Sequence, residues 1–237
     1  FDKMPSSGCC FSAVATTNAQ WIPQAHVEPL SQARRNLAAA SVDNKAFFAG
    51  GFIGNSNYSN VIDIYDNSSD SWSTYQLSSP RESLSGASVG NKVLFAGGGA
   101  TFQTKGVDIY DNSNNNWSYE ERLFTARAQM SAITAGNKVF FAGGEEYGPV
   151  VSSVVDVYDD NTGNWTHTNL SQARAYMGGA TAGGKVFFAG GWSGSSHSNV
   201  VDIFDAGTGN FVQSITLPTA RDRLSGASVG TKVLFAG

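Results

Sequence analysis

Residues 47–51 read F-F-A-G-G, and this phrase recurs along the chain at a constant spacing. Close copies follow at residues 94–98, 140–144 and 187–191, and residues 234–237 read L-F-A-G. The first residues of successive copies are 47, 46, 47 and 47 positions apart. A fixed period in this range indicates an array of similar supersecondary units. We therefore expect one repeat architecture instead of several unrelated domains.

The unit around the second copy divides into four short strand patterns. Residues 84–89 are mostly small, and residues 90–91 read Gly-Asn, a hairpin turn that needs a positive φ. Residues 92–98 form the continuous apolar run of a strand that is buried on both faces. Residues 106–111 alternate apolar and polar side chains, and Trp117 opens an outer strand. Four antiparallel strands in a unit of this length predict one blade of a β-propeller.

Three further landmarks recur in step with the glycine phrase. Each unit opens with an arginine, namely Arg34, Arg81, Arg127, Arg174 and Arg221. A motif Asp-x-Tyr/Phe-Asp occupies residues 63–66, 108–111, 156–159 and 202–205. An aromatic residue follows each motif, namely Trp72, Trp117, Trp165 and Phe211.

This order of arginine, double glycine, tyrosine and tryptophan resembles the kelch repeat family, over nearly the whole chain. The resemblance implies an all-β, kelch-type β-propeller in which the first strand of each blade lines a central channel. We expect the glycine pairs to permit close backbone approach and the aromatic residues to fill the space between blades. We expect the paired aspartates to cap turns.

We expect a single propeller domain over residues 11–237, after an N-terminal extension at residues 1–10. Four of its five four-stranded blades would span residues 34–80, 81–126, 127–173 and 174–220. The fifth would be shared between the termini, with residues 11–33 supplying the outer strands and residues 221–237 the inner ones. Residues 11–21 match residues 107–117 in length, and both segments end on tryptophan.

Two alternatives to this closure remain open. The chain could belong to a larger propeller, or its N-terminal strands could join a neighbouring molecule, which would make it a structural subunit that self-assembles. Closure by the chain's own termini would hide sheet edges that otherwise pair with other chains. The N-terminal copy lacks both aspartates and the tyrosine of the motif.

Composition excludes several kinds of partner. Only 14% of the residues are charged and the net charge is −4, which excludes nucleic acid or anionic membranes recognised through bulk charge. No apolar stretch approaches the roughly 20 residues that cross a bilayer, so we expect no membrane insertion. Low cysteine content and abundant Asn, Ser and Thr favour an extracellular location. The adjacent Cys9 and Cys10 are expected to be buried thiols, with a disulfide to another chain as the alternative.

The loops between the second and third strands are the variable part of the repeat, and we expect them to bind a ligand. They carry aromatic residues where no core needs them, namely Phe52, Tyr58, Phe102, Tyr147 and Trp192. Such rings offer flat surfaces to a peptide or, as the alternative, to a carbohydrate.

The five unit-opening arginines are expected to ring the channel mouth on the same face. Converging guanidinium groups need carboxylates, either from neighbouring blades or from a bound anion. Related kelch domains bind acidic peptides through arginines at matching positions. We therefore expect a protein-interaction scaffold whose ligand is a protein or an acidic peptide.

We expect no catalytic residues, metal or cofactor. The three histidines, His26, His167 and His197, are far apart in the repeat, and no Ser-His-Asp or Cys-His arrangement is evident. A sugar mutarotase that works with arginine, Glu145 and Glu146 is the remaining enzymatic alternative.

Overall fold

The computed structural model describes residues 29–237, which form β-strands joined by turns and loops. Most of the segment 11–33 that was expected to complete the fifth blade, namely residues 11–28, lies outside the described residues, as do Cys9 and Cys10. Within them no helix is long and apolar enough to span a membrane.

The described residues form four complete antiparallel blades and the first two strands of a fifth. Blade 1 contains β1 (Ala38–Val42), β2 (Lys45–Ala49), β5 (Val61–Asp66) and β6 (Ser71–Gln76). Blade 2 contains β7 (Ser85–Val89), β8 (Lys92–Ala96), β9 (Gly106–Asp111) and β10 (Asn116–Glu121). Blade 3 contains β11 (Ser131–Ala135), β12 (Lys138–Ala142), β13 (Val154–Asp159) and β14 (Asn164–Asn169). Blade 4 contains β15 (Gly178–Ala182), β16 (Lys185–Ala189), β17 (Val200–Asp205) and β18 (Phe211–Thr216). The incomplete blade contains β19 (Ser225–Val229) and β20 (Lys232–Ala236).

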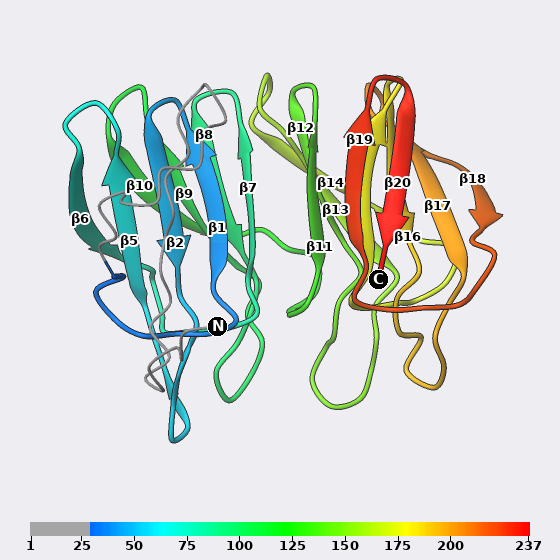
Figure 1. Cartoon of the computed structure of the whole chain (residues 1–237), viewed down its shortest axis with the longest axis horizontal. Coiled ribbons are helices and arrows are strands. Elements are labelled where there is room, and N and C mark those ends of the chain that lie inside the picture. Colours follow the sequence, from blue (N-terminus) through cyan, green and yellow to red (C-terminus); the bar gives the residue numbers. More distant parts are fainter. Residues whose placement is uncertain (1–28) are drawn as a thin grey trace, which may run out of the picture.

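The first strands of successive blades lie side by side on the inner side of the array. Contacts join β1 to β7, β7 to β11, β11 to β15 and β15 to β19. The loops between the second and third strands emerge at one end of the blades, together with the linkers that lead to the next blade (Figure 1). In blade 1 this loop contains a small hairpin, β3 (Phe52–Gly54) with β4 (Asn57–Tyr58). The predicted grouping of these loops on one face is confirmed.

The hydrophobic core lies between blades as well as within them. One cluster joins Phe47 and Ile62 of blade 1 to Phe95 and Tyr110 of blade 2, and all four are buried. Trp117 of blade 2 packs against this cluster, with its ring 6.1 Å from that of Phe47. Trp117, and Trp165 at the boundary between blades 2 and 3, therefore fill the space between blades as the sequence predicted. Phe211 is 40% exposed and packs on Phe204 of its own blade.

The double glycines join each blade to the next. The N–H of Gly144 donates to the carbonyl of Arg174 in the following blade, at 2.9 Å. A Cβ on the preceding Gly143 would lie 2.1 Å from the same carbonyl oxygen, so only glycine fits there. The matching bonds run from Gly51 to Arg81, from Gly98 to Arg127 and from Gly191 to Arg221, each at 2.8 Å.

The second aspartate of each Asp-x-Tyr/Phe-Asp motif caps the turn that follows, as predicted. Asp111 accepts hydrogen bonds from the backbone N–H of Ser113 at 2.9 Å and from its hydroxyl at 2.6 Å. These two bonds hold the pKa of Asp111 below its usual value. The corresponding residues Asp66, Asp159 and Asp205 also have lowered pKa values, through bonds to Ser68, Lys138 and Lys185 respectively.

These caps predict a loss of stability in acid. A carboxyl whose pKa is lower in the folded than in the unfolded chain stabilises the fold fully at pH values above its unfolded pKa. This contribution is lost as the pH falls from the unfolded pKa through the folded pKa. We expect Asp111→Asn to lower the melting temperature at pH 7 by about 2 °C and to flatten the decline in stability between about pH 5 and 3. Thermal unfolding followed by circular dichroism at several pH values checks this, and an unchanged pH dependence would contradict it.

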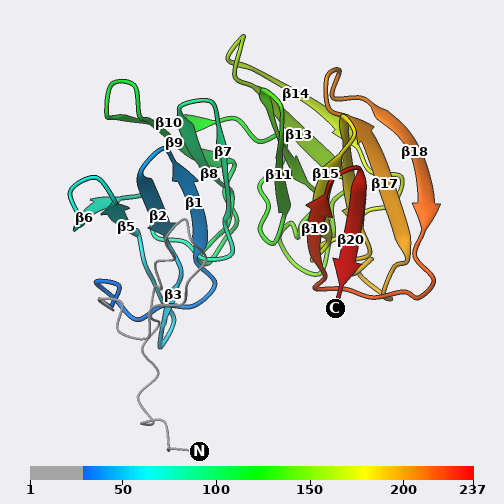
Figure 2. The same ribbon diagram turned by 45° about the horizontal axis from the view of Figure 1, so that its top comes forward.

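Among residues 29–237, the fifth blade consists of β19 and β20 alone. Val229 and Leu234 are 66% and 54% exposed, whereas Val89 and Leu94 at the same positions of blade 2 are 3% and 0% exposed. The four blades and strands β19–β20 form an arc, with blade 1 and strands β19–β20 at its two ends (Figure 2).

Candidate ligand-binding face

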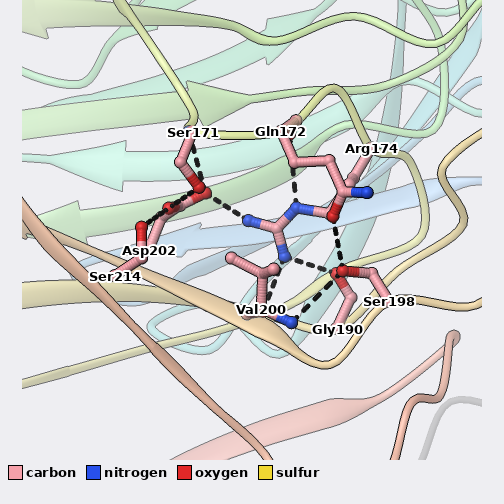
Figure 3. Close-up of polar contacts among 8 residues, drawn as sticks. All are labelled: Ser171, Gln172, Arg174, Gly190, Ser198, Val200, Asp202 and Ser214. Carbon is pink, nitrogen blue, oxygen red and sulfur yellow. Dashed lines mark hydrogen bonds and ion pairs between the residues drawn. The ribbon is translucent and has the colours of Figure 1, made fainter.

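Four of the five unit-opening arginines, Arg34, Arg81, Arg127 and Arg174, are buried inside their own blades. Figure 3 shows Arg174, whose guanidinium donates to the carbonyls of Gly190 at 2.6 Å and Val200 at 2.7 Å and forms an ion pair with Asp202. Asp202 also accepts a bond from the Ser171 hydroxyl in the linker from blade 3, at 2.6 Å. The arginine therefore ties the start of its blade to the second and third strands, and the aspartate ties the blade to the preceding linker.

The same anchor occurs in all four complete blades. The ion pairs are Arg34 with Asp63, Arg81 with Asp108, Arg127 with Asp156 and Arg174 with Asp202. Each arginine side chain is at most 1% exposed. Burial lowers the pKa of Arg127 and Arg174 from the ordinary value, while the paired carboxylates oppose the shift.

Two expectations from the sequence are therefore wrong. These four arginines do not form an exposed ring for an anion, because their guanidinium groups are enclosed, and each forms an ion pair with an aspartate of its own blade. The first aspartate of each motif is the arginine's partner instead of a turn cap. Arg221, in the incomplete blade, is partly exposed and donates to the carbonyl of Gly237 at 2.9 Å.

A different ring lies two residues after each arginine. Here the backbone adopts the left-handed conformation in five non-glycine residues, Asn36, Ser83, Gln129, Tyr176 and Arg223, with φ between 53° and 57°. Backbone bonds connect them in order, from Ser83 to Asn36 at 2.9 Å, Gln129 to Ser83 at 3.0 Å, Tyr176 to Gln129 at 3.4 Å and Arg223 to Tyr176 at 2.9 Å. We call these five residues the left-handed ring. A left-handed conformation costs a non-glycine residue about 1 kcal/mol, and such strain is concentrated at functional sites.

Side chains of this ring bond across the boundaries between blades. The Asn36 amide donates to the Glu82 carboxylate at 2.6 Å, and the Gln129 amide donates to the Ser83 hydroxyl at 2.7 Å. At the other end of the ring, the Arg223 guanidinium lies 4.5 Å from the centre of the Tyr176 ring. The result is a nearly continuous belt of polar groups from blade 1 to the incomplete blade.

The Tyr176 hydroxyl remains a hydrogen-bond donor at every physiological pH. Burial, together with the charge of the hydrogen-bonded Glu145, raises the pKa of Tyr176 to about 12. Arg223 also pairs with Asp222 at 2.7 Å, and Asp222 lies 3.3 Å from the His197 imidazole. This end of the belt therefore offers a phenol, a guanidinium and two carboxylates to a ligand.

The five predicted loop aromatics fall into three groups. Phe52 packs on Tyr58 at 5.5 Å between ring centres and carries the Arg35 guanidinium at 4.8 Å. Phe102 of blade 2 and Tyr147 of blade 3 meet at 5.2 Å and are 64% and 70% exposed. Trp192 stands apart and packs on His197 of its own loop at 5.4 Å. The loops thus surround the left-handed ring with separate aromatic surfaces.

Each of these loops is connected to the ring. Isolated β-bridges join Arg35 to Phe52, Glu82 to Gly99, Ala128 to Glu145 and Ala175 to Trp192. The first residue of each bridge immediately precedes a member of the left-handed ring, so the loop bases and the ring form one face. Among residues 29–237, no group of three or more His, Cys, Asp or Glu side chains is arranged to hold a metal ion.

Comparisons with known proteins agree with this architecture. The model of the kelch motif matches residues 33–75, which span the first arginine to the outer strand of blade 1. Among solved structures, that of YjhT superposes with a TM-score of 0.70 at 16% sequence identity, over 90% of this chain and 81% of that chain. No curated protein matches the chain. The fold is a kelch-type β-propeller, and the resemblance stated from the repeat is confirmed.

Sequence reasoning missed the left-handed ring, although a signal was present. Every unit has the pattern Arg-x-z-Leu/Met, in which z is Asn36, Ser83, Gln129, Tyr176 or Arg223. The arginine two residues before z and the Leu or Met after it are nearly constant, whereas z itself differs in every repeat. Varied side chains at one position of a constant scaffold are typical of recognition surfaces.

Proposed function

We propose that this propeller is a non-catalytic interaction scaffold that binds a protein or peptide through the left-handed ring and the surrounding loops. One observation carries the proposal: five different side chains occupy the same strained backbone position around one face. Glycine would relieve the strain at each position, and none of the five is glycine. Kelch propellers in general serve as protein-interaction scaffolds, which supports this class of function.

The chemistry of the face favours a polar ligand of mixed charge. Arg35 and Arg223 are exposed cations, and Glu82 and Glu145 are partly exposed acids. The expectation of an acidic partner depended on the arginines that are now seen to be buried. We propose instead a peptide loop that exchanges hydrogen bonds with the amides, hydroxyls and charged groups of the belt, while its apolar side chains contact the loop aromatics.

A peptide display experiment tests this function. Peptides selected from a random library against the purified chain should lose at least tenfold affinity for Gln129→Ala/Tyr176→Ala, which is about 1.4 kcal/mol. The control Asn67→Ala, in an exposed turn at the other end of blade 1, should leave affinity unchanged. Calorimetric titration measures both, and matching melting temperatures establish that the variants fold. Selected peptides that bind the double variant as tightly as the parent would contradict the proposal.

The exposed Phe102–Tyr147 pair favours carbohydrate as a second candidate ligand, because two adjacent rings can stack on the faces of a sugar. A glycan array read with the parent and with Phe102→Ala/Tyr147→Ala separates the two ligands. Binding of a glycan by the parent and its loss in the variant would support carbohydrate recognition. If no glycan on the array binds the parent, carbohydrate would be excluded as a ligand of this face.

A further inference from the structure

A polar cleft of about 240 Å³ lies between blades 2 and 3. Asp111 and Asn116 of blade 2 and Tyr158 and Gly163 of blade 3 line it, together with Lys92 of β8. These residues lie where β8 and β10 begin and where β9 and β13 end, at the end of the blades opposite the loops (Figure 1). The cleft is therefore separate from the left-handed ring, and the proposed function does not use it.

At the boundary between blades 1 and 2, a side chain fills the same position. Asn115 of blade 2, five residues after Tyr110, accepts hydrogen bonds from the Tyr110 hydroxyl at 2.7 Å and from the Lys45 ammonium of blade 1 at 3.1 Å. In blade 3 the residue five positions after Tyr158 is Gly163. Within the described part of the chain, no atom lies within 4 Å of a Cβ placed on Gly163. The cleft therefore opens where blade 3 has glycine in place of asparagine.

The aromatic ring that covers the boundary between blades 1 and 2 is also replaced at the next boundary. Tyr75 of blade 1 stacks on Trp117 of blade 2, with 4.9 Å between ring centres. The residue that matches Tyr75 in blade 2 is Glu120, which instead pairs with Arg122 at 2.7 Å and borders the cleft. Two substitutions, at positions 120 and 163, therefore account for the cleft.

The loss of the asparagine side chain leaves two polar groups of the cleft with one acceptor fewer. The Lys45 ammonium has three oxygen acceptors within 3.1 Å in blade 2. The matching Lys92 ammonium bonds to Asp160 at 2.5 Å and to Tyr158, but Gly163 replaces the third acceptor. The Tyr158 hydroxyl donates to Asp160 at 3.4 Å, and burial raises the pKa of Tyr158, so the hydroxyl remains protonated. A ligand oxygen in the cleft would therefore meet two donors, the ammonium and the phenol.

We propose that the cleft between blades 2 and 3 binds one neutral sugar ring, either free or at the end of a glycan. Its lining combines an ammonium, a phenol, carboxylates, amides and the Ser118 hydroxyl, which donate and accept hydrogen bonds as sugar hydroxyls do. A charged ligand is disfavoured, because Lys92 and Glu120 already have ion-pair partners and Asp111 repels an anion. The buried Ile109 offers a contact to the apolar face of a ring. The volume is below the roughly 300–1,000 Å³ of pockets for drug-sized ligands, so it suits a single ring.

Gly163→Asn tests the site by restoring the side chain that blade 2 has at this position. Asn115 has φ of 54° and Gly163 has φ of 70°, so the backbone accepts asparagine. Neutral monosaccharides and their methyl glycosides are titrated against the purified chain by saturation-transfer NMR. We expect dissociation constants on the order of 1 mM for a ligand of about twelve non-hydrogen atoms. Gly163→Asn should weaken binding by about tenfold or more without lowering the melting temperature.

Gly136→Asn is the matched control, because Gly136 has φ of 60° and lies in a turn at the same end of blade 3 without lining the cleft. It should leave sugar binding unchanged, as should Phe102→Ala/Tyr147→Ala on the loops. Glu120→Tyr restores the covering ring and should weaken binding as Gly163→Asn does. The proposal is overturned if no sugar binds, if Gly163→Asn binds as tightly as the parent, or if the Gly136 control loses binding equally. Binding of the methyl glycosides as well as the free sugars would identify the end of a glycan as the ligand, and binding of the free sugars alone would identify a monosaccharide.

Discussion

Gly143→Ala is expected to destabilise the protein by about 4 kcal/mol or to prevent folding. The new methyl group would lie 2.1 Å from the carbonyl oxygen of Arg174 and 2.6 Å from the end of the Met177 side chain. The methionine can move, but the carbonyl accepts the Gly144 N–H and cannot. The clash would therefore separate blade 3 from blade 4. Urea denaturation followed by tryptophan fluorescence measures the loss.

Gly136→Ala is the matched control for this substitution. Gly136 has φ of 60° and Gly143 has φ of 62°, so alanine meets the same backbone strain at both positions. No atom lies within 4 Å of a Cβ placed on Gly136, so strain alone should cost about 1 kcal/mol. A similar loss in the two variants would show that the approach between blades is not what requires glycine at position 143.

Arg127→Met is expected to cost about 3–5 kcal/mol. Asp156, whose side chain is 3% exposed, would remain buried without its cation, and the carbonyls of Gly143 and Val154 would lose their donors. Combining it with Asp156→Asn should recover part of the loss, because the amide still accepts the Phe124 N–H without a charge. Equilibrium unfolding of both single variants and the double variant gives the coupling energy.

The exposed pair of Arg122 and Glu120 provides the control for the buried anchor. Its arginine side chain is 51% exposed and lies 2.7 Å from the carboxylate. Arg122→Met should change stability by less than about 1 kcal/mol, because solvent screens the pair. If Arg127→Met reduced stability as little as Arg122→Met, the buried arginines would not act as anchors of the blades.

Much of the fold could be predicted because its signals are local and repeated. Gly90 adopts the positive φ of 53° that a tight hairpin requires, and residues 106–111 form the predicted strand β9. The alternation in β9 indicated a half-buried strand, which is wrong: all its residues except Asp111 are buried, because Asp108 pairs with Arg81. Gly143 and Gly144 were expected to permit close approach, and they do so between blades. Because the unit recurs along the chain, each of these patterns could be read in several copies before a strand or turn was predicted from it.

The candidate site could not be predicted in the same way because its geometry is not local. Arg127 and Asp156 are 29 positions apart, and nothing in a single sequence shows that the two side chains meet. The sequence placed the arginines correctly at the start of each blade but could not show whether they face the channel or the blade interior. Gln129 and Tyr176 escaped notice because neither residue type commonly adopts the left-handed conformation.

Under the proposed function, each residue of the left-handed ring contributes its backbone to the fold and its side chain to ligand binding. The strained conformation of the ring is the same for an amide, a hydroxyl, a phenol and a guanidinium side chain, and the same kind of backbone bond links its members in order. Folding depends on the N–H and carbonyl of each residue, while its side chain is free to change. Under the proposed function, exchanging one side chain per blade would change the specificity of the face, and the five positions could be varied together in a small combinatorial library.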